Sequence, residues 1–249
     1  MKRFQDKVVV VTGGSSGIGL AAAKQFVAEG AHVYITGRRQ HELDVAAKVI
    51  GHNVTAVQAD VSVIADLERL YENVVAARGR IDVVFANAGY VEKGVLGELS
   101  EEQYHRQFDT NVKGVLFTVQ LALPLMTSGG TIVLCGSING SKGFAASSLY
   151  SASKAALRSF ARSWTEDLKQ KGIRVNVVSP GPTHTNVLEA SGYTSDQITG
   201  VKDRLARAIP LGRMADPAEV ASSVLFLASN DSSFVAGAEL FVDGGYAQI

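Results

Sequence analysis

Two side chains four residues apart, a phenol and an ammonium, have a spacing that allows acid–base chemistry. Tyr150 and Lys154 lie in a stretch with helical periodicity, and residues at i and i+4 share one helix face with Cβ atoms ~6 Å apart. A phenol with an ordinary pKa of about 10 is a poor base at neutral pH, but a neighbouring ammonium stabilises the phenolate. The pair therefore predicts a general acid–base with an assisting cation, although this spacing is also common between ordinary surface residues.

Two further polar residues strengthen this interpretation. Ser137 ends an apolar run typical of a strand, and its hydroxyl is suited to hold a substrate oxygen on which negative charge develops. Asn111 falls inside a predicted helix, where asparagine has poor propensity. We therefore expect its side chain or a local break in the helix to serve a purpose, with a purely structural role as the alternative.

A glycine-rich turn joins the first predicted strand to the first predicted helix, where residues 12–19 read TGGSSGIG. Glycine makes up 25 of 249 residues, about 10% against a usual ~7%, and part of this surplus falls in the turn. Such a turn lets the backbone approach a pyrophosphate at the positive end of a helix. It predicts dinucleotide binding, with an ordinary tight connection as the alternative. The residues expected at the cofactor are Gly13, Ser15, Ser16, Gly17, Ile18 and Gly19.

The end of the second predicted strand bears on which dinucleotide is bound. NAD binding predicts a carboxylate there for the ribose 2′-hydroxyl, but residues 36–39 read TGRR. Arg38 and Arg39 are suited to pair with a 2′-phosphate, which favours NADP(H), with two solvated surface arginines as the alternative. The residues that follow the third and fourth strands are also expected at the cofactor: Asp60, Val61, Asn87, Ala88 and Gly89.

The elements that position these residues alternate between strands and helices. Strands are predicted at Val8–Val11, His32–Thr36, Val54–Gln58, Ile81–Phe85, Thr131–Cys135, Arg174–Val178 and Glu239–Val242. Helices are predicted at Ile18–Glu29, Arg39–Ile50, Val63–Ala77, Glu101–Leu123, Leu149–Lys171 and Pro217–Ala228. This order predicts an α/β fold, a single Rossmann-type domain over residues 1–249 whose doubly wound sheet has seven parallel strands and helices on both faces. Residues 183–210 lack clear periodicity and are a candidate substrate lid.

Composition argues against several other classes of protein. The chain carries 24 basic and 24 acidic side chains and no long basic run, so neither nucleic acid nor a membrane is expected as a partner. No stretch has the length of a signal-peptide core or a membrane span, and a cytoplasmic location is expected. The single cysteine, Cys135, excludes an internal disulfide, and five histidines without ligand spacing predict no metal.

These residues together resemble the short-chain dehydrogenase/reductase family, and the likeness spans residues 8–245. Residues 12–19 are similar to its cofactor loop, and residues 87–89 to its sheet-stabilising motif. Asn111, Ser137, Tyr150 and Lys154 match its catalytic tetrad in order and spacing. The resemblance implies that Lys154 also binds the nicotinamide ribose and that Asn111 holds a water linking it to solvent. It further implies a homotetramer, and cofactor contacts from Pro180, Gly181, Thr183 and Thr185 in the nicotinamide-side loop.

The expected function is an NADP(H)-dependent oxidoreductase that interconverts a ketone or aldehyde and an alcohol. Mostly apolar walls favour a hydrophobic substrate, with core packing as the alternative role; the residues expected at the substrate are Ser137, Ile138, Tyr150, Val187, Leu188 and Tyr193. A 3-oxoacyl-carrier-protein reductase ranks second, because residues 90–94 lack the Ile-Thr-Arg sequence that such reductases often carry there. A non-catalytic nucleotide sensor ranks third, because it predicts loss of one or more tetrad residues and all four are present.

Overall fold

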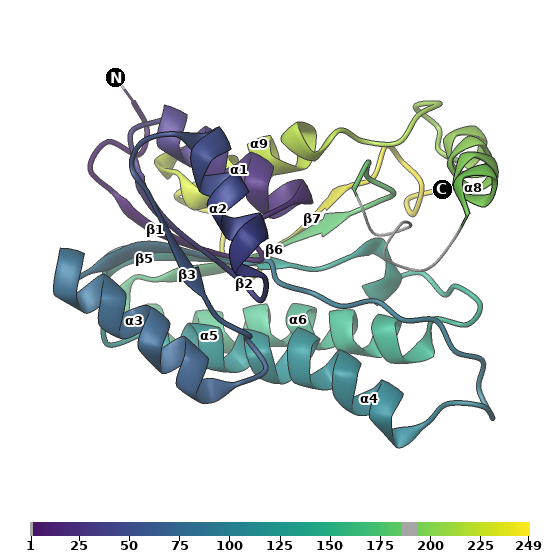
Figure 1. The fold of residues 1–249 in the computed structure, drawn as a ribbon, viewed down its shortest axis with the longest axis horizontal. Coiled ribbons are helices and arrows are strands. Elements are labelled where there is room, and N and C mark those ends of the chain that lie inside the picture. The colour runs from purple at the N-terminus through teal and green to yellow at the C-terminus, as the bar shows by residue number, and fades with distance from the viewer. Residues whose placement is uncertain (1, 186–193) are drawn as a thin grey trace.

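A parallel sheet forms the framework of the computed structural model, which describes residues 2–185 and 194–249 (Figure 1). Its seven strands lie in the order β3-β2-β1-β4-β5-β6-β7, and every neighbouring pair is parallel. The predicted doubly wound α/β fold is confirmed. The strands are β1 Val8–Thr12, β2 His32–Gly37, β3 Val54–Gln58, β4 Ile81–Ala86, β5 Met126–Cys135, β6 Arg174–Pro180 and β7 Glu239–Val242.

Helices cover both faces of the sheet. One layer contains α1 (Gly17–Ala28), α2 (Gln40–Ile50) and α9 (Pro217–Ala228), and the other contains α3 (Ile64–Arg78), α5 (Gly114–Ala122) and α6 (Ser148–Asp167) (Figure 1). Strand β1 shows why the sheet needs both layers, because Val9 and Val11 join the core of the first layer while Val8 and Val10 join the second. Fully burying one such side chain contributes ~1.5–3 kcal/mol, so apolar residues hold the strand from both sides.

The strand order changes direction between β1 and β4, since the chain adds β2 and β3 on one side of β1 and all later strands on the other. The loops that follow β1 and β4 therefore diverge at the carboxyl edge of the sheet. Open α/β sheets bind their ligands in the crevice that such a reversal creates.

The helix predicted at Glu101–Leu123 is present over residues 101–122, but a π turn interrupts its regular α-helical geometry. The structure has α4 at Glu101–Phe108, a π-helical turn at Asp109–Lys113 and then α5. The expected start is present, because the Ser100 hydroxyl accepts a hydrogen bond from the Gln103 backbone N–H at 3.2 Å. The break lies at Asn111, the residue whose poor helix propensity suggested one.

A helix absent from the sequence expectation, α8 at Ser195–Ala208, occupies much of the stretch predicted to lack regular structure. It starts with a capping box in which the Thr194 hydroxyl accepts from the Gln197 backbone N–H. The Thr-x-x-Gln spacing of that capping box is visible in the sequence at residues 194–197 and marks the start of the helix. Among the described residues, none of the helices combines the length and apolar character needed to cross a bilayer.

Candidate active site

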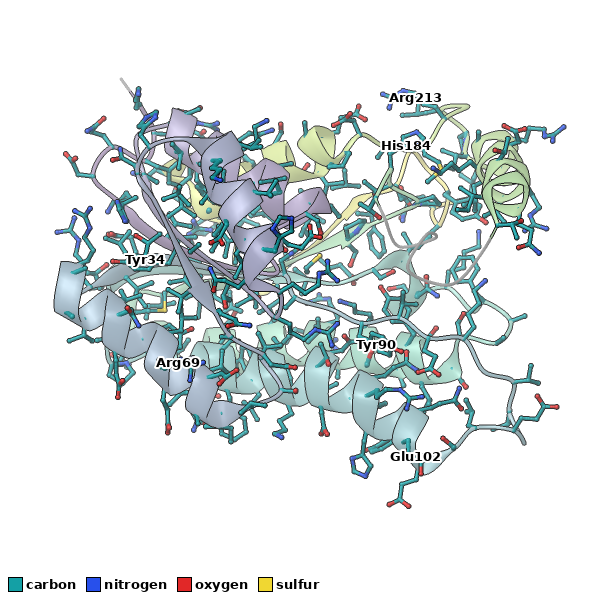
Figure 2. All side chains as sticks on the ribbon, in the orientation of Figure 1. Tyr34, Arg69, Tyr90, Glu102, His184 and Arg213 are labelled. Carbon is teal, nitrogen blue, oxygen red and sulfur yellow. The ribbon has the colours of Figure 1, made fainter. Side chains whose placement is uncertain are left out.

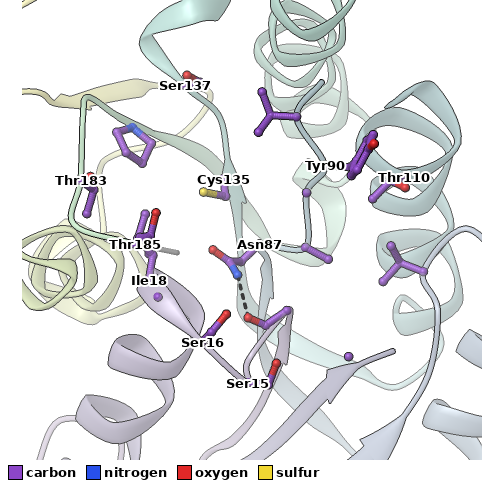
Figure 3. A pocket seen from close by; sticks show the side chains of 18 of the residues that line it. Ser15, Ser16, Ile18, Asn87, Tyr90, Thr110, Cys135, Ser137, Thr183 and Thr185 are labelled. Carbon is purple, nitrogen blue, oxygen red and sulfur yellow. Dashed lines mark hydrogen bonds between the residues drawn. The ribbon is translucent and has the colours of Figure 1, made fainter. Parts of the chain in front are cut away.

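A cavity of about 450 Å³ opens at the carboxyl edge of the sheet, and most of the predicted site residues line it (Figure 3). Figure 3 shows Ser15 and Ser16 at one end and Ser137 at the other. The predicted residues brought together there are Gly13, Ser15, Ser16, Gly17, Ile18, Arg38, Arg39, Asp60, Val61, Asn87, Ala88, Gly89, Ser137, Tyr150, Lys154, Pro180, Gly181, Thr183 and Thr185. Gly19, Asn111 and Ile138 are not among its lining residues, and Val187, Leu188 and Tyr193 lie outside the described residues.

The glycine-rich turn forms a cradle with little room for side chains. Gly13 has a φ of +64°, and a Cβ atom there would lie 3.0 Å from the Ala88 Cα. Gly19 serves packing, because a Cβ atom at that position would lie 2.2 Å from the Gly13 carbonyl oxygen. Asn87 holds the turn from β4, since its Nδ2 donates to the Thr12 carbonyl oxygen at 2.9 Å and to the Gly13 carbonyl oxygen at 3.2 Å. Figure 3 shows Asn87 beside this turn. The backbone is therefore exposed at close range to whatever lies in the cavity.

The first turn of α1 points its N–H groups at the same place. Ser16 is the N-cap residue of α1, and within the described chain its side chain makes no capping hydrogen bond. The amino end of a helix carries partial positive charge and unpaired donors. A glycine-rich turn beside N–H groups that lack a side-chain cap fits the pyrophosphate of a dinucleotide.

The two predicted arginines line the same cavity beside the glycine turn, because a Cβ atom on Gly37 would lie 3.4 Å from Ser15 Oγ. Arg38 and Arg39 follow β2 and are exposed, and no carboxylate stands between them and the strand. Arg39 has an acidic neighbour, with its Nε 4.0 Å from Glu42 Oε1, whereas Arg38 makes no ion pair with any described residue. Gln58 Nε2 donates to the Arg38 carbonyl oxygen at 2.8 Å and so fixes the backbone below the guanidinium. Arg38 therefore presents an uncompensated positive charge to the cavity.

At the other end, Lys154 is a buried ammonium held by a backbone carbonyl. Its side chain projects from α6, the residue is 5% exposed, and Nζ donates to the Cys135 carbonyl oxygen at 2.7 Å. The same nitrogen lies 5.7 Å from the centroid of the Tyr150 ring, so the predicted i, i+4 neighbours do share a helix face. Burial raises the pKa of the Cys135 thiol, which keeps that cavity-lining side chain protonated.

Ser137 caps a short 3-10 turn at Ile138–Gly140 that links β5 to the segment before α6. Its hydroxyl accepts from the Asn139 backbone N–H at 3.2 Å, and it lines the cavity while only 8% exposed. Ile138, by contrast, is 4% exposed and does not line the cavity. The capped turn presents the serine hydroxyl to the cavity and buries the next side chain.

The carboxamide of Asn111 makes protein contacts through both its oxygen and its nitrogen. Its Oδ1 accepts from the Tyr90 backbone N–H at 2.7 Å, and its Nδ2 donates to the Tyr90 carbonyl oxygen at 2.8 Å and to Ser153 Oγ at 3.0 Å. Gly89 leaves space beside it, because a Cβ atom at Gly89 would lie 3.5 Å from Lys154 Nζ and 3.6 Å from Asn111 Oδ1. The π turn thus brings Asn111 and Lys154 to opposite sides of one small gap.

Tyr90 is a cavity residue that the sequence expectation missed. It directly follows the motif at residues 87–89, so its position after a strand end is a signal that could have found it (Figure 2). Its hydroxyl donates to Glu92 Oε2 at 3.1 Å, and Arg106 Nη2 donates to the other carboxylate oxygen at 2.9 Å. These guanidinium hydrogen bonds hold the pKa of Glu92 below its ordinary value. The charged pair fixes the Tyr90 ring as a wall of the cavity.

The last wall comes from the region around α8. Leu205 on α8 and Met214 after it line the cavity and supply apolar surface; both were missed because that helix was not predicted. The segment 180–185 is held against the residues before α9, since the His184 backbone N–H donates to the Ala215 carbonyl oxygen at 2.9 Å (Figure 2). Thr185 reaches the glycine turn, where a Cβ atom on Gly17 would lie 3.1 Å from its Cγ2.

Comparison with known proteins gives likeness over nearly the full length. A family model described as Enoyl-(Acyl carrier protein) reductase matches residues 13–247. The oxidoreductase asL5 of Sarocladium schorii is 49% identical, over 100% of this chain and 99% of that protein. A meso-2,3-butanediol dehydrogenase of Serratia marcescens is 38% identical, over 98% of this chain and 95% of that protein. A doubly substituted short-chain dehydrogenase/reductase of Serratia marcescens has a solved structure with a TM-score of 0.90 and 31% identity, covering 98% and 99% of the two chains.

Proposed function

The chain belongs to the short-chain dehydrogenase/reductase family of oxidoreductases, which use a nicotinamide cofactor, and on that premise we propose that it interconverts a hydrophobic ketone or aldehyde and an alcohol with NADP(H). The observation that carries the proposal is the content of one cavity. A glycine cradle and an unpaired Arg38 line one end, and Ser137, Tyr150 and the buried Lys154 line the other. The first set suits a phosphorylated dinucleotide, and the second suits proton transfer to an oxygen.

Each catalytic side chain has one task in this proposal. A nicotinamide cofactor held in this cavity would supply or accept the hydride at the substrate carbon. Ser137 donates a hydrogen bond to the carbonyl oxygen, on which negative charge grows during reduction. Tyr150 gives that oxygen its hydroxyl proton and becomes phenolate, and the Lys154 ammonium stabilises the phenolate until a proton returns. A water in the gap beside Gly89, held near Asn111, would connect Lys154 to solvent. Oxidation of an alcohol reverses these steps.

Cofactor choice rests on Arg38. A 2′-phosphate meets a guanidinium that has no other acidic partner among the described residues, and charge-assisted hydrogen bonds of this kind are the strong ones. NAD(H) would offer only a hydroxyl at that position, and the end of β2 has no carboxylate to accept from it. The proposal therefore assigns NADP(H), with Arg38 as the main determinant.

A hydrophobic substrate is supported by apolar side chains in the cavity lining, among them Val91, Leu205 and Met214. The proposal also includes a single domain over residues 1–249, a lid within residues 183–210, a cytoplasmic location and a homotetramer. The homotetramer is proposed from the family resemblance. Light scattering of the purified protein tests the assembly, and a monomer would contradict it.

A 3-oxoacyl-carrier-protein reductase is the second candidate, because a 3-oxoacyl-[acyl-carrier-protein] reductase of Salmonella typhimurium is 33% identical over 97% of this chain and 98% of that protein. It ranks below the first because residues 90–94, which begin at the cavity wall, do not read Ile-Thr-Arg. Assays of simple ketones beside an acyl-carrier substrate separate the two. Activity on the acyl-carrier substrate well above that on ketones would reverse the order.

The central experiment replaces Tyr150 by phenylalanine, which removes only the hydroxyl. Because positioned acid–base groups contribute roughly 10²–10⁴ in rate, we expect kcat for ketone reduction to fall by at least about 10² while NADPH binding, followed by its fluorescence, changes little. Tyr104→Phe is the matched control, since that ring is exposed on α4 away from the cavity lining. Turnover of Tyr150→Phe at the parent rate would refute the mechanism. Tight NADPH binding by the parent with no turnover across a broad panel of ketones and alcohols would favour the non-catalytic sensor.

A further inference from the structure

The turn that follows β7, Asp243–Tyr246, contacts three segments that border the cavity. We propose that this turn is a positioning device, joined to the catalytic side through Lys142, that sets the nicotinamide-side segment 180–185 against the segment that carries Ser137. The inference rests on the proposed function, because it assigns the turn a part in hydride-transfer geometry. It makes Lys142 and Tyr246 positioning residues, which act through Ser137 and not on the substrate.

The turn is tied to the nicotinamide-side segment at Gly181. The Gly181 backbone N–H donates to the Val242 carbonyl oxygen at 3.0 Å, and a Cβ atom on Gly181 would lie 2.7 Å from the Asp243 Cα. Asp243 makes the turn stiff, because its carboxylate accepts from the backbone N–H groups of Gly245 at 2.9 Å and Ala247 at 2.8 Å. Any shift of the turn therefore moves Gly181 with it.

The same turn is tied to the catalytic side at Lys142. Lys142 Nζ donates to the Tyr246 carbonyl oxygen at 2.7 Å and lies 4.9 Å from the centroid of the Tyr246 ring. The Phe144 ring approaches the same ring at 6.0 Å between centroids. Among described residues no carboxylate pairs with Lys142, so its ammonium is committed to the turn. Charge-assisted hydrogen bonds and cation–π contacts are among the stronger non-covalent contacts at a partly buried site.

Lys142 passes this attachment on to the catalytic residues through a short backbone path. Its own N–H donates to the Ile138 carbonyl oxygen at 2.8 Å, which closes the turn capped by Ser137. Gly140 in that turn lies directly on α6, since a Cβ atom there would be 3.2 Å from the Ala155 backbone nitrogen. The position of Ser137 relative to α6 therefore depends on where Lys142 is held.

A third contact reaches the end of α8. The Leu211 backbone N–H donates to the Gly244 carbonyl oxygen at 3.3 Å, and Gly244, with a φ of +62°, approaches so closely that a Cβ atom would lie 2.7 Å from Ile209 Cγ2. The turn thus contacts segment 180–185, the segment that carries Ser137 and Lys142, and the end of α8, the helix that carries Leu205. Misplacement by about 1 Å of groups that must meet in a reaction can cost on the order of 10² in rate, so a shared support for them matters to turnover.

The test replaces Lys142 by methionine, which keeps the length of the side chain but removes the ammonium. Lys142→Arg is the conservative variant, and Lys171→Met, at an exposed position, is the matched control. For Lys142→Met we expect kcat to fall about tenfold and the isotope effect with 4-deuterated NADPH to rise, while NADPH affinity stays within about twofold. Lys142→Arg should recover most of the rate. Amide hydrogen exchange should quicken about fivefold both in residues 137–142 and in residues 181–185.

Several results would overturn the inference. One is an unchanged kcat in Lys142→Met, and another is an equal loss of kcat in Lys171→Met. A third is faster amide exchange confined to residues 137–142, which would mean that the contact stabilises only its own segment. If Lys142→Met does not fold, Tyr246→Leu removes the ring and its contact with Phe144, and the same exchange pattern is expected. If the parent reduces no substrate, the proposed function fails, but hydrogen exchange in the two segments still decides whether the turn couples them.

Discussion

Replacement of Arg38 by alanine is the sharpest test of cofactor choice. The guanidinium lines the cavity, is exposed and has no ion pair with any described residue, so its removal leaves no buried charge unpaired and does not disturb the fold. A hydrogen bond to a charged group contributes ~1.5–3 kcal/mol, and solvent screening at an exposed site favours the lower end. Since about 1.4 kcal/mol is tenfold in affinity, KM for NADPH should rise about tenfold.

The assay compares kcat/KM for NADPH and NADH at low and high ionic strength. NADH lacks the 2′-phosphate, so its kcat/KM should change by less than about twofold, and added salt should weaken NADPH binding more in the parent than in Arg38→Ala. Arg39→Ala is the comparison variant: its guanidinium also lines the cavity but has Glu42 Oε1 4.0 Å from its Nε, so a smaller rise in KM for NADPH is expected. A parent enzyme with a higher kcat/KM for NADH than for NADPH would refute the reasoning.

Two further variants probe the proton path and the acid stability of the fold. At saturating NADPH, Gly89→Ala should lose about tenfold in kcat and gain a larger solvent isotope effect. Its methyl group fits in contact with Lys154 Nζ and Asn111 Oδ1 but fills the gap proposed for water. An unchanged kcat would place the proton path elsewhere. Hydrogen bonds from Arg213 hold the pKa of Glu219 at about 2, below its ordinary value of 4.5. The ionised carboxylate therefore stabilises the fold fully at pH values above 4.5, and this contribution is lost as the pH falls toward about 2. The excess stability of the parent over Glu219→Gln, measured by urea unfolding, should therefore shrink below about pH 4.5, and a pH-independent difference would contradict it.

Local sequence patterns are enough to predict much of the candidate site. The i, i+4 spacing of Tyr150 and Lys154 depends on helix geometry alone, and α6 begins at Ser148, so the two side chains share a face as expected. The positions of Arg38 and Gly89 follow from strand ends in a parallel sheet, whose carboxyl ends meet at one edge. These inferences need only short-range periodicity and the order of the elements.

Other features depend on contacts between distant residues, which local patterns do not encode. Poor helix propensity at Asn111 suggested a break, but the occupation of its carboxamide by Tyr90 depends on how the loop after β4 meets the π turn. Gly19 was expected at the cofactor because it belongs to the motif, yet its lack of a side chain serves packing against Gly13. Ile138 was expected at the substrate, but the turn capped by Ser137 buries it.

The π turn at Asp109–Lys113 determines where the protein can lose one residue and still fold. Deleting one residue from an α-helix rotates everything beyond it by about 100°, which takes its apolar face out of register with the core. A π turn is a one-residue insertion that a widened turn has absorbed. Loss of one residue there would restore a regular helix and leave α4 and α5 facing the same neighbours. Deletion of one residue in this stretch should therefore yield folded protein that has lost the hydrogen bonds between Asn111 and the Tyr90 backbone. Deletion of one residue within α5 should abolish folding.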